Sequence, residues 1–214
     1  MSIRDKVKQY GWENSLKLFL KGILRIVRIE FESYWLLENN LCSDEISQKM
    51  KDFDYSDVKE LNLEDFKKGD PTIFNEVKLK LIEERFESGQ YWSYGVFSGS
   101  ELIYSCWITT LEIGFRKKYN TSIPLLEDEG YLEDAYTHPD YRGKGLHSKM
   151  NLFRIMSLIK KGKSRNYVLV LSENNPAMKS QLKSGFVKVE KMTFLILFGK
   201  HFFLKKHIND TNKN

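Results

Sequence analysis

The chain has 214 residues, of which 41% are hydrophobic, 29% charged and 14% aromatic, with a formal net charge of +5. This length and composition predict one folded α/β domain over residues 1–214 and exclude a disordered chain. Two cysteines are too few for a disulfide framework, no run of 18 uncharged apolar residues exists, and the four histidines lack zinc-site spacing. We therefore expect a cytoplasmic protein that holds no metal and carries no signal peptide.

Positive charge is concentrated in the first 29 residues, which carry seven cations and two anions. Apolar residues recur at helical spacing from Leu16 to Val27, beside a second stripe of lysines and arginines. The pattern predicts a basic amphipathic helical lead over residues 1–30. One interpretation is a core-packing helix with a solvated basic face. The other is a contact of residues 12–28 with a membrane, peripherally at its inner surface.

Changes of period and turn residues predict the remaining elements in chain order. The first half is expected to contain a strand at Val27–Leu37, a helix opened by Asp70 and Pro71 that ends near Glu87, an aromatic hairpin (Tyr91–Phe97 and Leu102–Thr110) and a loop at residues 114–128. The second half is expected to contain strands at Glu129–Thr137 and Tyr167–Leu171, helices at about Gly145–Lys161 and Asn174–Lys183, a hairpin (Val187–Phe198 and His201–Lys206) and a flexible tail at residues 208–214.

The most informative stretch is residues 136–146, Tyr-Thr-His-Pro-Asp-Tyr-Arg-Gly-Lys-Gly-Leu, between a predicted strand and a predicted helix. Gly143 and Gly145 lack Cβ atoms where the backbone would approach a ligand, and the first amides of a helix can bind an anion. Arg142 and Lys144 add positive charge. The spacing is equally consistent with an anion site and with a helix cap that binds nothing. Neither a P-loop nor a complete dinucleotide fingerprint is present.

This stretch resembles the acyl-CoA pyrophosphate loop of the GNAT superfamily of N-acyltransferases. The superfamily pattern Arg/Gln-x-x-Gly-x-Gly/Ala is matched by Arg142 and Gly145, whereas the last position is His147. Asn174-x-x-Ala177 followed by Gly185-Phe186 resembles a second motif of the same superfamily. The resemblance covers roughly Tyr91 to Lys206. It implies a GNAT-like central mixed β-sheet flanked by helices, with splayed parallel strands near 131–137 and 167–172.

The same resemblance implies acetyl-CoA or another acyl-CoA as co-substrate. The residues it places at the cofactor are Tyr136, Thr137, Arg142, Gly143, Lys144, Gly145, Leu146, His147, Asn174 and Ala177. Transfer to an amine requires a base, and period two puts Glu133 and Asp134 on opposite faces of their strand. The resemblance favours Glu133 as base, with Asp134 next, although either could be a structural acid. Gln181 stands where the superfamily often has a general-acid Tyr, which leaves Tyr136 or water.

The predicted function is therefore acetyl transfer from acetyl-CoA to a primary amine by direct attack. The surroundings of Glu133 resemble superfamily members of surface polysaccharide synthesis, which implies a nucleotide-linked amino sugar as acceptor. A small amine, an aminoglycoside-like molecule and a protein amine remain alternatives, as does a CoA-binding or interaction module without turnover. Nucleic acid is not an expected partner, because the chain beyond residue 29 is nearly neutral. Monomer and homodimer both remain open.

Overall fold

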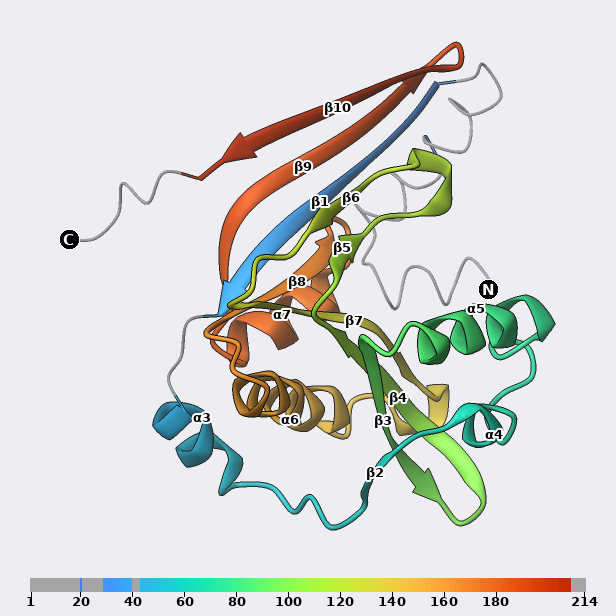
Figure 1. Cartoon of the computed structure of the whole chain (residues 1–214), viewed down its shortest axis with the longest axis vertical. Helices are drawn as coiled ribbons and strands as arrows, with labels where there is room; N and C mark the ends of the chain where they lie inside the picture. Colours follow the sequence, from blue (N-terminus) through green and yellow to red (C-terminus); the bar gives the residue numbers. More distant parts are fainter. Residues whose placement is uncertain (1–19, 21–28, 40–42, 209–214) are drawn as a thin grey trace. The chain divides into compact units, whose positions relative to one another are not determined.

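The computed structural model describes residue 20, residues 29–39 and residues 43–208 (Figure 1). The chain forms two compact units. One contains Met1–Asn39, Phe115–Thr121 and Val168–Asn214, and the other contains Asn40–Gly114 and Ser122–Tyr167. The predicted helical lead, the membrane contact of residues 12–28 and most of the predicted tail lie outside the described residues, and the single domain stays a prediction.

The unit around residues 40–167 is built on four strands in the order β7-β4-β3-β2. They are β2 (Val58–Glu60), β3 (Tyr91–Ser98), β4 (Glu101–Thr109) and β7 (Glu129–Thr137), and each neighbouring pair is antiparallel. A separate two-stranded sheet contains β5 (Glu112–Gly114) and β6 (Ser122–Pro124). The helices of this unit are α3 (Ser43–Met50), α4 (Leu63–Phe66), α5 (Glu76–Glu87) and α6 (Leu146–Lys160), with a 3-10 turn η2 at Pro139–Tyr141.

Helices cover both faces of this sheet. On one face, Phe66 of α4 and Ile82 of α5 pack against Trp107 of β4. On the other face, Met150 of α6 packs against Tyr104 of the same strand. Figure 1 shows α4 and α5 on the opposite side of β3 and β4 from α6. Strand β4 is therefore buried from end to end, apart from its first residue, as its aromatic and β-branched sequence predicts.

The other unit is a sheet with the strand order β10-β9-β1-β8. Its strands are β1 (Ile29–Asn39), β8 (Arg165–Leu171, in this unit from Val168 onward), β9 (Val187–Leu197) and β10 (Lys200–His207). Strand β9 pairs antiparallel with both β1 and β10. Helix α7 (Asn175–Lys183) and the 3-10 turn η1 (Lys117–Tyr119) complete this unit.

Most predicted elements are confirmed, but two are wrong. Helix α5 begins at Glu76 and not at Pro71, because the side chain of Asn75 accepts a hydrogen bond from the amide of Lys78 and caps the helix there. Asp70 instead caps a local turn, accepting from the amide of Thr72. The predicted loop at residues 114–128 contains η1 and β6. Among the described residues, no helix has the length and apolar character needed to cross a membrane.

Candidate functional site

The glycine-rich stretch forms the connection that the sequence predicts. Strand β7 ends at Thr137, η2 follows, and α6 begins at Leu146 after Gly143 and Gly145, whose φ angles are 79° and 81°. These left-handed angles explain why both positions are glycine. A Cβ atom at either position would meet nothing within 4 Å, so space beside the backbone stays open. Arg142 is fixed at the edge of this space by a bond from its Nε to the Thr137 carbonyl oxygen, at 3.2 Å.

The start of α6 has the properties of an anion site. Gly145 is the N-cap residue and supplies no side-chain cap, and the first turn contains no acidic residue. The positive end of the helix dipole therefore faces the exposed backbone of the loop. Arg142 and Lys144 are both exposed beside it. Cationic side chains, open glycines and a helix N-terminus together fit a pyrophosphate group.

His147 does not obstruct this space, contrary to what its position suggests. Its Nδ1 lies 3.1 Å from the hydroxyl of Tyr104, so the ring turns toward β4 and away from the glycine backbone. Burial lowers the pKa of His147 to about 3, and the nearby Arg154 guanidinium acts in the same direction. The imidazole is therefore neutral near pH 7. The departure from the Gly/Ala pattern is accommodated inside the unit.

A β-bulge interrupts β7 before the loop. Glu133 pairs with Trp107 and Tyr136 pairs with Ser105, so Asp134 and Ala135 together face one residue of β4. Asp134 takes a φ of 47°, which Asp tolerates better than most residues. Arg154 of α6, which is 1% exposed, donates from the other face to the Glu133 carbonyl oxygen at 3.4 Å.

The bulge corrects the expectation that Glu133 and Asp134 point to opposite faces. Both carboxylates reach the guanidinium of Arg85 on α5, at 2.7 Å for Glu133 and 2.6 Å for Asp134. Lys78, two turns earlier on the same face of α5, also contacts Asp134. Strict alternation fails because the extra residue shifts the phase of the strand. Both candidate bases therefore lie on the face covered by α5.

The guanidinium of Arg85 makes cation–π contacts with two aromatic rings. Its guanidinium carbon is 5.1 Å from the ring centre of Trp107 and 5.6 Å from that of Tyr91. Its side chain is only 14% exposed. Sequence reasoning does not single out Arg85 or Lys78, since a helical charge pattern does not show which carboxylates of a distant strand these side chains will meet.

The two carboxyl groups titrate differently. Burial raises the pKa of Glu133 to about 7, although Arg85 opposes the shift. Burial acts in the same direction on Asp134, but Lys78 and Arg85 outweigh it and lower the pKa of that carboxyl below its usual value. Glu133 is thus the carboxyl group whose protonation changes near neutral pH, while Asp134 stays ionised.

Tyr136 joins the same face. Its ring lies edge-on to Phe74, with centroids 5.2 Å apart, and packs against the cluster of Phe66 and Trp107. Its buried hydroxyl makes no hydrogen bond within the described part of the chain. Burial raises the pKa of Tyr136, so the hydroxyl is a proton donor and not a phenolate near pH 7.

The second sequence motif lies in the unit that contains α7. The Asn174 side chain accepts a hydrogen bond from the amide of Ala177 at 3.3 Å, and so caps α7. Gln181 is 2% exposed, and its backbone carbonyl oxygen accepts a hydrogen bond from the backbone amide of Phe186. The motif thus has a clear structural role in ending strand β8 and starting the helix. Among the described residues, no group of three or more His, Cys, Asp or Glu side chains could hold a metal ion.

The fold is that of the GNAT acetyltransferases, as the sequence predicts. No protein-family model matches the sequence, and no curated protein matches it either. Solved structures do: a GNAT-family acetyltransferase from Colwellia psychrerythraea superposes with a TM-score of 0.55 at 12% identity, over 84% of this chain and 62% of that one.

Two further structures agree. A GCN5-related N-acetyltransferase-like protein from Streptococcus suis gives a TM-score of 0.54 at 13% identity, over 87% of this chain and 67% of that one. A conserved protein of unknown function from Staphylococcus epidermidis gives 0.53 at 9% identity, over 90% and 68%. The chain spans less than two thirds of the Colwellia protein. At these identities the likeness shows the fold alone.

Proposed function

We propose that this protein is an acyl-CoA-dependent N-acyltransferase that transfers an acetyl group to a primary amine. One observation carries the proposal. A single strand, β7, holds a buried carboxyl group of pKa about 7 at Glu133 and then runs directly into an open, cationic loop at the start of α6. In a GNAT fold, this pairs a base for the acceptor with a phosphate site for the donor.

Residues 142–147 would hold the pyrophosphate of acyl-CoA. The open backbone at Gly143 and Gly145 admits the group, and Arg142 and Lys144 supply opposite charge. Backbone groups of Tyr136 and Thr137 would bind the pantetheine. When bound, acyl-CoA supplies an activated thioester carbonyl for attack by the amine.

Glu133 is the proposed base. An acceptor reaches the site as an ammonium ion, and the Glu133 carboxylate removes a proton before the nitrogen attacks. Asp134, which stays ionised, would attract the cation and is the next candidate for base. The Tyr136 hydroxyl is the proposed acid that returns a proton to the departing sulfur, with water as the alternative. Turnover should rise with pH through about 7, as Glu133 loses its proton.

A nucleotide-linked amino sugar of surface polysaccharide synthesis is the proposed acceptor, on the sequence resemblance around Glu133. A small amine, an aminoglycoside-like molecule and a protein amine are the competing acceptors. The two carboxylates favour a cationic acceptor of any of these kinds.

The second candidate function is a CoA-binding module without turnover. The ion pairs of Arg85 with both carboxylates favour it, because they occupy the groups that an acceptor would need. Free-thiol release from acetyl-CoA with a panel of amino sugars, polyamines and peptides separates the two candidates. Calorimetric titration with CoA is the companion measurement. Tight CoA binding without thiol release for any amine would refute the transferase and leave the module.

A further inference from the structure

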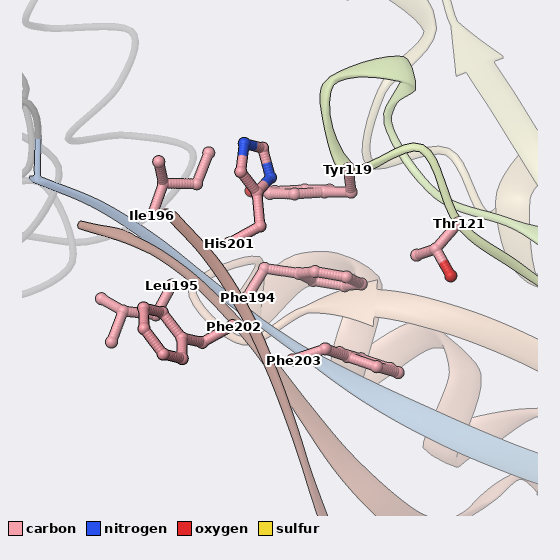
Figure 2. Close-up of a pocket in the computed structure, with 8 residues that line it drawn as sticks. All are labelled: Tyr119, Thr121, Phe194, Leu195, Ile196, His201, Phe202 and Phe203. Atoms are coloured by element: carbon pink, nitrogen blue, oxygen red, sulfur yellow. The ribbon is translucent and has the colours of Figure 1, made fainter. Parts of the chain in front are cut away.

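The three-stranded ribbon β10-β9-β1 has two faces that differ in their cover. On one face, Phe194 of β9 stacks between Tyr119 and Phe203, with ring centroids 4.1 Å and 4.5 Å away. Phe115 meets the same ring edge-on at 4.8 Å. Figure 2 shows these stacked rings beside the segment that carries Tyr119 and Thr121. On this face Phe194 is 4% exposed under its neighbouring rings, whereas Phe203 stays 38% exposed at the edge of the ribbon.

The opposite face carries an exposed apolar band. Phe31, Leu195 and Phe202 are direct cross-strand partners, so their side chains share one face of the ribbon. Figure 2 shows Leu195 and Phe202 on the other side of the strands from Phe194. Phe31, Phe202 and Leu204 are 36%, 45% and 59% exposed. Large exposed side chains in adjacent rows form a contiguous apolar patch. A single exposed leucine is common on protein surfaces, but a contiguous patch marks an interaction site.

Lysines lie at both ends of this band. Lys200 is the partner of Leu197 in the row nearest the hairpin turn. Two rows beyond Phe202, Lys206 is the partner of Lys191, whose ammonium lies 5.4 Å from the Trp35 ring. Along β10, this face therefore carries a lysine, an aromatic residue, an aliphatic residue and a second lysine in successive rows. Residues 187–208 contain five lysines and one glutamate.

The hairpin turn adds a costly exposed aromatic residue. Phe198 has a φ of 49° and Gly199 a φ of 83°, the left-handed pair of a two-residue turn that favours Asn-Gly. A phenylalanine is strained in this conformation, yet its side chain is 74% exposed and packs little within the chain. Asn would suit this turn better than Phe198, and most of the Phe198 ring is exposed to contact a partner.

We propose that this apolar face and the Phe198 turn dock onto an anionic lipid surface. Phe198, Phe202 and Leu204 would enter the interface between headgroups and acyl chains, while the lysines at both ends reach the lipid phosphates. A second copy of the chain fits less well, because pairing two such faces brings the lysine rows near one another. This inference goes beyond the proposed function and does not depend on it.

Co-sedimentation with vesicles tests the proposal. The wild-type protein should bind vesicles of phosphatidylcholine and phosphatidylglycerol (3:1), bind pure phosphatidylcholine weakly, and leave the anionic vesicles as salt rises. The double variant Phe202→Ser/Leu204→Ser should lower the partition coefficient roughly tenfold or more. Leu126→Ser, at a position that is 61% exposed in the other unit, is the matched control and should bind as the wild type does.

Phe198→Asn separates docking from folding. Asn suits the turn, so the unfolding temperature should stay equal or rise, while vesicle binding falls several-fold. Wild-type binding that is absent, or equal on neutral and anionic vesicles, overturns the proposal. So does a dimer in solution that the hairpin variants abolish, which would assign the face to a second copy. Binding that survives these variants but is lost in Lys17→Glu/Lys21→Glu also overturns it, since residues 12–28 would then make the contact.

Discussion

The middle and the end of strand β7 differ in whether other side chains of the protein already occupy their candidate binding groups. At the bulge, Arg85 and Lys78 already occupy the carboxylates of Glu133 and Asp134. At the loop, Gly145 and its neighbours leave open space beside a helix N-terminus. On the proposed function, the donor end is ready to bind as folded. The acceptor end must exchange an internal cation for the ammonium of its substrate.

The largest expected effect lies at the open end. Gly145→Glu places a carboxylate in the phosphate site, and CoA affinity should fall by roughly a hundredfold or more. Gly162→Glu is the matched control, because Gly162 has a φ of 80° and equally open surroundings just after the other end of α6. It should lose similar stability but keep CoA affinity, as measured by calorimetry. If both variants bind CoA with equal affinity, the loop does not bind the pyrophosphate of the donor.

Next in size is the loss of the base. Glu133→Gln should lower kcat about a hundredfold and leave CoA affinity unchanged, because an amide cannot accept the proton. The rise of turnover with pH near 7 should vanish from its profile. Asp134→Asn is the comparison variant, measured on the same amine. If that variant loses more activity than Glu133→Gln, the base is Asp134.

The ion pair of Arg85 gives a smaller, directional effect. Arg85 holds the pKa of Glu133 below the value that burial alone would give, so Arg85→Gln should raise it by about one unit. The pH profile of kcat should move to the alkaline side by the same amount. Lys80→Gln, an exposed position of the same helix, should leave the profile in place. A shift to the acid side in Arg85→Gln would contradict the assigned electrostatics.

The last effect concerns the free energy of unfolding and not binding or turnover. Glu133 has a folded pKa of about 7 against an ordinary value of 4.5, so the folded state holds the proton more tightly. Its contribution to the free energy of unfolding is complete below pH 4.5 and is lost as pH rises to about 7, with an upper size of about 3 kcal/mol. Urea unfolding between pH 4.5 and 8 should show this decline in the wild type and a flatter course in Glu133→Gln. If the free energy of unfolding depends on pH equally in both proteins, the pKa of Glu133 lies near its ordinary value.

The sequence predicts the open end of β7 better than the filled end. Gly143, Gly145 and the start of α6 depend on residues that are close in sequence, so spacing alone indicates their geometry. The meeting of Arg85 with Glu133 depends on the packing of α5 against the sheet, which no local pattern records.

Three further features could not be predicted from the sequence, each for a specific reason. Asp70 and Pro71 predict a helix start, but Asp70 caps a local turn there and the side chain of Asn75 caps α5 instead. Strict alternation predicts the wrong face for Asp134, because it holds only in a strand without an inserted residue. The sequence also does not show that the His147 ring turns inward to the hydroxyl of Tyr104.

The bulge at Asp134 and Ala135 acts as a change of phase within one strand. The alternation of side chains between the face covered by α5 and the face covered by α6 is therefore shifted by one residue after the bulge. Removing one residue there would turn Tyr136 and Thr137 over while leaving Glu133 where it is. The one extra residue of the bulge therefore places Glu133 and Tyr136 on the same face of the strand. Deleting that residue would separate the two groups.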